Sequence, residues 1–245
     1  MILMFTDFGW KGPYLGQMES VLRRDVPDIP IINLMSDAPA FNPKAAGYLL
    51  SALTAEAPAG AVILGVVDPG VGSSAREPVV LHADGRWFVG PGNGLFNAVA
   101  ARADAAKWNR IQWQPPRLSV SFHGRDLFAP VAAGLASGHH VELEAFDGPD
   151  LAGWDGDLDE VVYIDGFGNA VTGIRADGLD RGSHLKAGPH TLRWARTFSD
   201  RPEGAAFWYG NSLGLVEIAA NKANAAEQLS LDIGTKIETL GLRKR

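Results

Sequence analysis

The stretch AVILGVVDPGVG, residues 61–72, joins an apolar run to a polar, glycine-rich loop. Residues 61–67 have the length and the near-continuous apolar character of a strand that is buried on both faces, as strands of parallel sheets are. The loop places Asp68 directly after this strand, and ligands of open α/β sheets bind at the carboxyl ends of strands. The stretch therefore predicts a parallel sheet with a polar site at one edge.

The sequence around this stretch repeats the pattern of apolar strands and amphipathic helices. Proline after a capping asparagine, as in Asn42-Pro43, is a helix-start signal, and Ala83-Asp84-Gly85 is typical of a hairpin turn. We expect strands at residues 2–5, 31–35, 61–67, 78–82 and 87–90, and helices at 14–22, 45–53 and 127–135. Strand–helix–strand order predicts an N-terminal α/β domain with a mostly parallel sheet, which we place at residues 1–145.

The texture of the sequence changes after Gly138. Residues 142–159 are acidic and rich in glycine and proline, which is typical of a linker. The segments beyond it are short and apolar, are separated by turn signals, and occupy residues 161–164, 170–174, 191–195, 205–209, 215–218 and 236–240. Strands with little helix between them predict a C-terminal β-barrel domain, which we place at residues 158–245.

Composition limits the classes of function. The 245 residues suffice for one large or two modest domains, and 46% hydrophobic with 20% charged residues is ordinary globular composition. The formal net charge is -6, and the short run Arg243-Lys244-Arg245 is the one basic cluster, so we expect no nucleic-acid partner.

The chain has no cysteine, which excludes disulfides, thiol catalysis and cysteine-ligated metals and fits a reducing compartment. The apolar run at residues 1–5 is too short for a signal peptide and lacks a basic region. No segment approaches the roughly 18 apolar residues that a membrane-spanning helix needs. We therefore expect a cytoplasmic protein with no membrane partner.

Polar motifs follow several predicted strands. Thr6-Asp7-Phe8-Gly9 follows the first strand, so that Asp7 and Asp68 are expected at the same edge of the sheet. Two turns with aspartate caps are the simpler alternative for either motif alone, but the pair favours a site. SFHGRD, residues 121–126, precedes a helix and places His123 where anions and partial charges are favoured.

Two motifs lie in the second half of the chain. DGFGN, residues 165–169, has small residues that permit a ligand to approach the backbone closely, although a tight turn explains it almost as well. GNSLG, residues 210–214, matches the nucleophile elbow of acyl hydrolases. That fold requires a histidine after the serine, and none follows Ser212, so Ser212 is a candidate ligand-binding residue and no nucleophile. His139 and His140 are interpreted as surface residues, and no metal site is predicted.

Taken in order, the motifs resemble those of the S-adenosyl-L-methionine (SAM) hydroxide adenosyltransferases, relatives of the fluorinases and chlorinases. The motifs are TDFG at 6–9, VVDPGVG at 66–72, NGL at 93–95, SFHGRDLFAP at 121–130, DGFGN at 165–169 and NSLG at 211–214. The similarity extends over essentially the whole chain. It implies an N-terminal α/β domain, a C-terminal β-barrel, and a homotrimer whose active sites lie between neighbouring subunits.

The resemblance also implies an activity: hydrolysis of SAM to adenosine and L-methionine by attack of water or hydroxide at C5′. SAM is then the substrate, and no cofactor or metal is expected. By position, the site residues are Asp68, Arg76 and His123 for catalysis, Asp7 for the ribose, Phe41 and Phe198 for the adenine, and Asp165, Asn169 and Ser212 for the methionine.

The chain departs from the family pattern at two positions. Gly12 replaces an aspartate that many relatives have near the methionine amine, so recognition of the amine is expected to rest on Asp165. Arg76 comes one residue later than the arginine of relatives, because Ser73-Ser74-Ala75 precedes it.

Two alternatives remain open. A halogenase of the same family would use chloride or fluoride, but fluorinases have Tyr and Ser at the positions of Asp68 and Gly124 and lack the counterpart of His123. Chlorinase-like relatives also have Gly at the position of Gly124, so Asp68 and His123 are the residues that discriminate. A non-catalytic protein that binds adenosyl ligands would need Asp7 and the aromatic residues but not His123.

Overall fold

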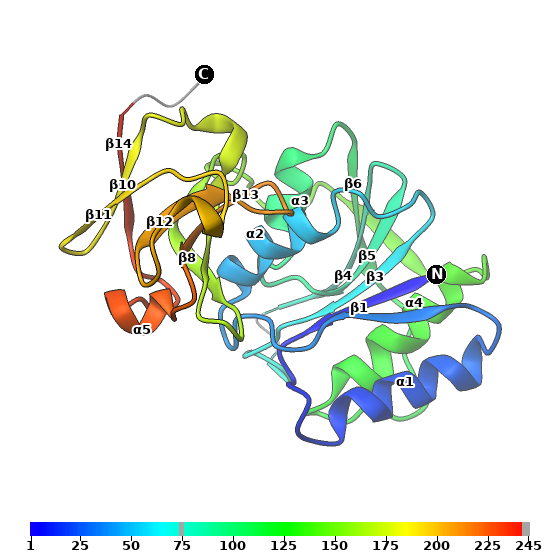
Figure 1. Ribbon diagram of the computed structural model, residues 1–245. Coiled ribbons are helices and arrows are strands. Elements are labelled where there is room, and N and C mark those ends of the chain that lie inside the picture. The colour runs from blue at the N-terminus through cyan, green and yellow to red at the C-terminus, as the bar shows by residue number, and fades with distance from the viewer. Residues whose placement is uncertain (74–75, 242–245) are drawn as a thin grey trace. The chain divides into compact units, whose positions relative to one another are not determined.

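The computed structural model describes residues 1–73 and 76–241, and the chain divides into two compact units, Met1–Asp155 and Gly156–Arg245 (Figure 1). The boundaries expected from the sequence, 1–145 and 158–245, stay predictions. Ser74 and Ala75, which shift Arg76 along the chain, and the basic run 243–245 lie outside the described residues.

Unit 1 is built on a seven-stranded sheet in the order β2-β1-β3-β5-β4-β6-β7. Its strands are β1 (Ile2–Thr6), β2 (Ile31–Met35), β3 (Val62–Val66), β4 (Pro78–Ala83), β5 (Arg86–Pro91), β6 (Ala106–Ile111) and β7 (Leu143–Phe146). The pairings β1–β2, β1–β3 and β3–β5 are parallel, and those of β4 and β6 with their neighbours are antiparallel. Five of the seven strands, β1, β2, β3, β5 and β6, therefore run in one direction, which confirms the mostly parallel sheet.

Helices cover both faces of this sheet (Figure 1). α1 (Tyr14–Asp25), the single π-helical turn η1 (Gly124–Phe128) and α4 (Ala129–Ala136) pack on one face, and α2 (Pro43–Leu53) and α3 (Asn97–Arg102) pack on the other. The predicted start of α2 is confirmed, since the Asn42 side chain accepts a hydrogen bond from the Ala45 N–H at 3.0 Å.

The two faces explain why the central strands are apolar throughout. Ile2 and Met4 of β1 belong to the core under α1 and α4, whereas Leu3 and Phe5 belong to the core under α2 and α3. Successive side chains of a strand point to opposite faces, so a strand covered on both sides needs apolar residues at every position. The edge strand β7 and its neighbour β6 carry mixed polar residues, which is why the sequence pattern did not predict them.

Two glycines make room for an aromatic side chain over the centre of the sheet. A Cβ atom at Gly65 of β3 would lie 2.8 Å from Cε1 of Phe96, which is fully buried. A Cβ atom at Gly90 of β5 would lie 2.1 Å from the main-chain oxygen of Gly65 and 2.9 Å from the Phe96 ring. The absence of side chains at both positions lets Phe96 contact the strands directly.

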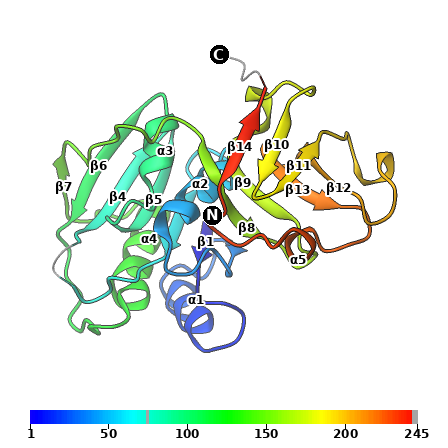
Figure 2. The ribbon, with the colours of Figure 1, turned by 90° about the vertical axis from the view of Figure 1, so that its left-hand side faces the viewer.

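Unit 2 consists of two antiparallel sheets, β11-β10-β14 and β12-β13-β9-β8. Figure 2 shows β10 beside β11 and β14. The strands are β8 (Leu158–Ile164), β9 (Ala170–Arg175), β10 (His184–Ala187), β11 (His190–Arg193), β12 (Ala206–Gly210), β13 (Leu215–Ala220) and β14 (Ile237–Leu240), with α5 (Ala225–Leu229) and the 3₁₀ turns η2 (Ala176–Gly178) and η3 (Phe198–Asp200) between them.

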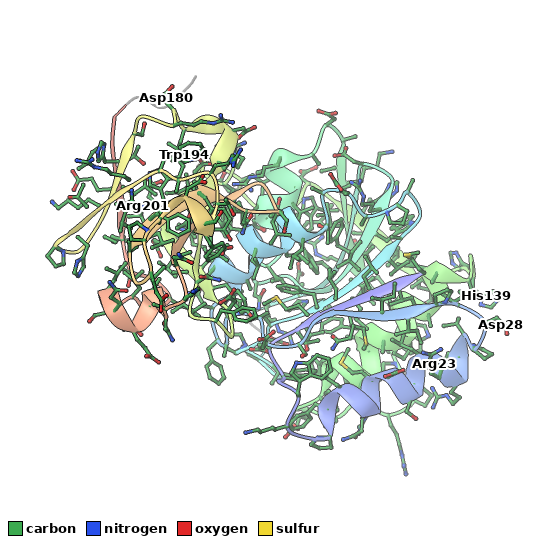
Figure 3. All side chains as sticks on the ribbon, in the orientation of Figure 1. Arg23, Asp28, His139, Asp180, Trp194 and Arg201 are labelled. Carbon is green, nitrogen blue, oxygen red and sulfur yellow. The ribbon has the colours of Figure 1, made fainter. Side chains whose placement is uncertain are left out.

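Single bridges join the two sheets at both seams. Trp194, labelled in Figure 3, bridges Trp208 in parallel, and Glu160 bridges Lys236 in antiparallel fashion. The closed arrangement encloses a core that includes Val161, Leu185 and Ile218. The six predicted strands of this unit are confirmed as β8, β9, β11, β12, β13 and β14, whereas β10 and the short α5 were missed.

Among residues 1–73 and 76–241, no helix has the length and apolar character needed to cross a membrane.

We predict that Gly65→Ala destabilises unit 1 by about 1–3 kcal/mol, because the added methyl group overlaps the Phe96 ring. Phe96→Leu should relieve part of this loss when the two changes are combined. Gly90→Ala is the matched control, since its Cβ would also meet a main-chain oxygen that Phe96→Leu leaves in place. Denaturant unfolding of the single and double variants measures the coupling. Strictly additive losses for Gly65→Ala and Phe96→Leu would contradict the packing argument.

Candidate active site

Two carboxylates lie at one edge of the sheet of unit 1. β1 and β3 are parallel neighbours, with Thr6 opposite Val66, so the residues that follow them emerge side by side. Asp7 accepts a hydrogen bond from the Phe41 N–H at 3.3 Å. Burial raises the pKa of Asp7 above its ordinary value, and the negative charge of Asp68 adds to this rise. The two aspartates that were expected at the same edge of the sheet thus lie close enough for their charges to interact.

Asp68, Arg76 and the partly buried His123 form a cluster. The side chains of Asp68 and Arg76 are only 5% and 6% exposed. Arg76 Nε donates to one carboxylate oxygen of Asp68 at 2.7 Å and Nη2 donates to the other, so the pair is bidentate. Arg76 Nη2 also lies 3.2 Å from His123 Nδ1. The structure therefore brings together the three residues proposed for catalysis, with Arg76 between the other two.

The charges of the cluster set the protonation of His123. Burial raises the pKa of Asp68, and the bidentate Arg76 guanidinium acts in the opposite direction. Burial, followed by the positive charge of Arg76, lowers the pKa of His123 below its ordinary value. Because a guanidinium can only donate, the Nδ1 that faces it must accept. We assign His123 as a neutral imidazole that carries its proton on Nε2.

Close backbone contacts hold the loop after β3 against the loop that precedes His123. Gly72 has φ +80°, and a Cβ atom there would lie 2.4 Å from the Val120 carbonyl oxygen. Only glycine allows both the left-handed backbone and this approach. On the other side, Asn93 Nδ2 donates to the Val67 carbonyl at 2.9 Å. The glycine of the VVDPGVG motif and the asparagine of the NGL motif thus fix the position of Asp68.

The SFHGRD motif forms a braced turn at the start of η1. Asp126 accepts a hydrogen bond from the Ser119 N–H at 2.9 Å and pairs with Arg125 at 2.6 Å. Arg125 lowers the pKa of Asp126, so this carboxylate stays ionised. Arg125 also donates to Gln17 of α1 at 2.8 Å. The turn that carries His123 is therefore tied to both η1 and α1.

Aromatic side chains gather beside the two carboxylates. Phe41 is 78% exposed and has φ +59°, an unusual backbone conformation for a residue with a Cβ. The rings of Phe8, Tyr14 and Phe122 contact one another with centroids 5.4–5.9 Å apart. Exposed rings at a sheet edge offer flat apolar surface to a ligand. Gly12, where relatives were expected to carry an aspartate, has φ +140° in the loop before α1.

Unit 2 holds the other predicted site residues. Asp165 Oδ1 accepts hydrogen bonds from the N–H groups of Phe167 at 2.9 Å and Asn169 at 2.8 Å, and Oδ2 accepts from Asn169 Nδ2 at 2.9 Å. Gly168 has φ +84°, and any Cβ there would collide with Asn224. The DGFGN motif is thus a tight turn, as the simpler interpretation held, and this turn also presents Asp165 to a pocket.

That pocket has a volume of about 880 Å³ and is lined by residues of unit 2 alone. Four of them, Asp165, Asn169, Phe198 and Ser212, were predicted from the sequence. Phe198 packs edge-on against Tyr209 with centroids 5.5 Å apart, and Ser212 is exposed in the turn between β12 and β13. Sequence reasoning missed Tyr209, Asn211 and Glu217. The available signal was a lone glutamate in the apolar strand LVEIAA, directly after the NSLG motif.

The predicted site residues form two separate sets. Asp7, Phe41, Asp68, Arg76 and His123 belong to unit 1, whereas the four residues named for the pocket belong to unit 2. Over the described ranges, no group of three or more His, Asp or Glu side chains is arranged to hold a metal ion. His139, labelled in Figure 3, follows α4 and is exposed, as is His140. This confirms that the two adjacent histidines are surface residues.

Comparison with known proteins places these two sets of residues in a family context. The chain is 35% identical to the (R)-S-adenosyl-L-methionine hydrolase of Thermus thermophilus, over 98% of this chain and 99% of that one. It is 33% identical to the enzyme of the same name from Salinispora arenicola, over 95% and 94%.

Two solved structures share the fold. An uncharacterized conserved protein from Thermotoga maritima matches with a TM-score of 0.88 at 30% identity, covering 98% of this chain and all of that one. A conserved hypothetical protein from Thermus thermophilus matches with a TM-score of 0.76 at 32% identity, covering 98% and 99%.

Models of two family domains match nearly the whole chain. The SAM hydroxide adenosyltransferase N-terminal domain matches residues 2–145, and the C-terminal domain of the same family matches residues 159–238. The chain belongs to the SAM hydroxide adenosyltransferase family.

Proposed function

We propose that this protein hydrolyses S-adenosyl-L-methionine to adenosine and L-methionine. The observation that carries the proposal is the buried ion pair of Asp68 and Arg76 with His123 against it, beside Asp7 at the ligand-binding edge of the sheet. A buried ion pair with a neutral histidine against it is expensive to maintain, and such perturbed groups concentrate at functional sites. Relatives that are named as hydrolases of this substrate support the same reaction.

The reaction needs a nucleophile more than it needs an acid. C5′ of the substrate carries a sulfonium, and when the C5′–S bond breaks its electron pair stays on sulfur, so methionine leaves as a neutral thioether. A water oxygen forms the new bond to C5′ and releases one proton. No general acid and no resident cofactor is required for these steps.

The three residues of the cluster divide the work on the water. Asp68 keeps unused lone pairs beside its bonds to Arg76 and accepts a hydrogen bond, and then the proton, from the water. His123 donates from Nε2–H to the water oxygen and fixes its direction, since its Nδ1 already accepts from Arg76. Arg76 holds both partners in register. Positioning of this kind contributes more to the rate than proton acceptance alone.

The remaining predicted residues bind the substrate in this proposal. Asp7 holds the ribose hydroxyls, and Phe41 and Phe198 stack on the adenine. Asp165, Asn169 and Ser212 bind the methionine portion, and Asp165 attracts its ammonium group. The carboxylates at both ends suit a cationic ligand.

The relatives' names add a stereochemical detail. A sulfonium with three different substituents is a stereocentre, and the relatives are named as hydrolases of the (R) form. We extend the proposal to this chain: the (R) epimer at sulfur is the preferred substrate. Only one epimer directs its methionine and adenosine groups to fixed pockets while leaving the C5′–S bond in line with the water.

We further propose a homotrimer in which neighbouring subunits share each active site, acting in the cytoplasm. The division of the predicted ligand-binding residues between unit 1 and unit 2 supports sharing, because neither set alone accounts for both the nucleophile and the methionine. The absence of cysteine supports a reducing compartment.

The products decide the reaction. Incubation with each SAM epimer in oxygen-18 water should yield adenosine labelled at the 5′-hydroxyl, faster from the (R) epimer, as read by mass spectrometry. Molar chloride should produce no 5′-chloro-5′-deoxyadenosine. A halogenated product would identify a halogenase, and binding without any product would identify an adenosyl-ligand-binding protein; either result rejects the proposal.

Removal of the catalytic groups should separate rate from binding. We expect Asp68→Ala and His123→Ala each to lower kcat by about 10²–10⁴-fold, since both act on the water. The affinity for SAM should stay within about tenfold, because neither residue is assigned to the bound ligand. His139→Ala, at an exposed histidine, is the control and should keep full activity. Wild-type turnover in either site variant would contradict the assignment.

The protonation of His123 is open to direct measurement. Nitrogen-15 NMR should show a neutral ring protonated at Nε2 and a titration midpoint below about 6.5, the ordinary pKa of histidine. Arg76→Met should raise the midpoint, because the repelling charge is gone, and should release the tautomer. His123→Asn assigns the signal. A ring protonated at Nδ1 in the wild type would exclude the proposed role of Arg76.

The assembly has its own test. Light scattering should give the mass of a trimer, and mixing an inactive Asp68→Ala chain with an inactive Ser212→Trp chain should restore part of the activity. Restoration requires that the two defects lie in sites built from different subunits. A fully active monomer, or no restoration in mixed trimers, would argue against shared sites.

A further inference from the structure

A buried carboxylate lies at the base of the pocket of unit 2. Glu217 is in the middle of β13, between the fully buried apolar residues Val216 and Ile218, and is itself only 6% exposed. Burying a carboxylate is costly unless hydrogen bonds replace its water. Glu217 has no role in the reaction proposed above, so the free-energy cost of burying its carboxylate needs a separate explanation.

Two side chains satisfy the Glu217 carboxylate. The Tyr209 hydroxyl donates to Oε1 at 2.6 Å from the directly opposite position on β12, and Asn211 Nδ2 donates to Oε2 at 2.8 Å. Both oxygens therefore accept, which is the pattern of an ionised carboxylate. Burial and the hydrogen bond to Glu217 raise the pKa of Tyr209, so its hydroxyl keeps the proton it donates.

Asn211 passes the constraint on to the turn that carries Ser212. Because its Nδ2 faces Glu217, its Oδ1 faces the other way and accepts from the N–H groups of Leu213 at 2.9 Å and Leu215 at 3.0 Å. If the amide turned over, its NH₂ group would face two donors. Glu217 thus fixes the orientation of Asn211, and Asn211 fixes the turn with Ser212 at its exposed tip.

The hydrogen bond from Tyr209 to Glu217 also fixes the position of the aromatic rings that contact Tyr209. Its ring meets Phe198 edge-on with centroids 5.5 Å apart, and both rings contact the fully buried Phe207. A single carboxylate therefore holds two separate parts of the pocket, the turn with Ser212 and the ring of Phe198.

We propose that Glu217 is a positioning residue that preorganises this pocket for the substrate, through Asn211 toward Ser212 and through Tyr209 toward Phe198. The inference rests on the proposed function, in which these two residues bind the methionine and the adenine. Since Glu217 acts on parts of the substrate that do not react, it stabilises the bound ground state and the transition state alike. Its loss raises KM and leaves kcat nearly unchanged.

The test uses two variants. The first removes the charge of Glu217, and the second moves that charge to position 211 and restores the hydrogen bonds. In Glu217→Gln the charge is lost and a single oxygen remains to accept, so the new NH₂ group either faces the NH₂ group of Asn211 or forces the Tyr209 hydroxyl to turn its proton away. We expect KM to rise about 10–100-fold with kcat within about twofold. In the double variant N211D/E217Q, an aspartate at 211 accepts from the glutamine and from the two N–H groups, and the net charge of the wild type is kept. KM should return to within about threefold of the wild-type value.

Controls separate positioning from general damage. Glu238→Gln removes an exposed carboxylate of the same unit that pairs with Lys186, and it should change neither constant. Tyr209→Phe removes one hydrogen bond from Glu217 and should raise KM less than Glu217→Gln does. If Glu217→Gln fails to fold, as circular dichroism would show, the double variant and Tyr209→Phe still test the network.

The outcomes are distinct. Wild-type KM in Glu217→Gln, a fall in kcat alone, or a folded double variant no better than the single one would overturn the proposal. Should Tyr209→Phe be the only folded variant, an unchanged KM would do the same. Failure of the proposed function shows instead as no adenosine from the wild-type protein. The positioning role is then measured by the dissociation constant for SAM in calorimetry, with the same order of variants expected.

Discussion

Taking a carboxylate out of water costs several kcal/mol unless another group replaces the water, and for Asp68 that group is the Arg76 guanidinium. The pairing forces the chain that leaves β3 to return within eight residues and to place Arg76 against Asp68 in a bidentate geometry. Gly72 permits the close passage under Val120 that this return requires, and Asn93 anchors the end of the strand. Removal of either charge would leave its partner buried alone, so the ion pair fixes Arg76 against Asp68, and Arg76 in turn contacts His123.

The same physical rule organises unit 2 around Glu217. There two neutral donors, the Tyr209 hydroxyl and the Asn211 amide, satisfy the buried carboxylate, where a guanidinium satisfies Asp68. The difference suits the two roles. A carboxylate held by a guanidinium keeps lone pairs for a water, whereas one held by Tyr209 and Asn211 orders the side chains that carry the pocket wall. In each unit, the hydrogen bonds that satisfy one buried carboxylate also fix the positions of the polar groups around it.

How far the sequence predicts this molecule depends on where each residue lies. β1 and β3 were predictable because strands covered on both faces must be apolar at every position, and Asp7 and Asp68 followed because they end those strands. β6, next to the edge strand β7, carries Lys107, Asn109 and Arg110 and gives no such pattern.

Some features of the site could not be predicted either, because they depend on contacts that only the folded chain forms. Glu217 and Tyr209 face each other only through the register of β12 and β13, which local spacing does not specify. Arg76 was placed by family position despite its shifted spacing. Its contact with His123 joins residues 47 positions apart, and the tautomer that follows from this contact emerges only from the folded chain.

The buried ion pair also bears on which nucleophile the proposed site selects. A bare carboxylate would exclude halide ions by repulsion, but Arg76 neutralises much of the charge of Asp68, although Asp7 adds a second negative group nearby. Selection must then rest on hydrogen bonding. Water can donate to Asp68 and accept from His123 Nε2–H at the same time, whereas a halide can only accept. A halide in this place would leave a buried carboxylate oxygen facing an anion with no proton between them. In the proposed reaction this pairing of one acceptor with one donor favours water, and the donor is the Nε2–H that the contact of His123 Nδ1 with Arg76 requires.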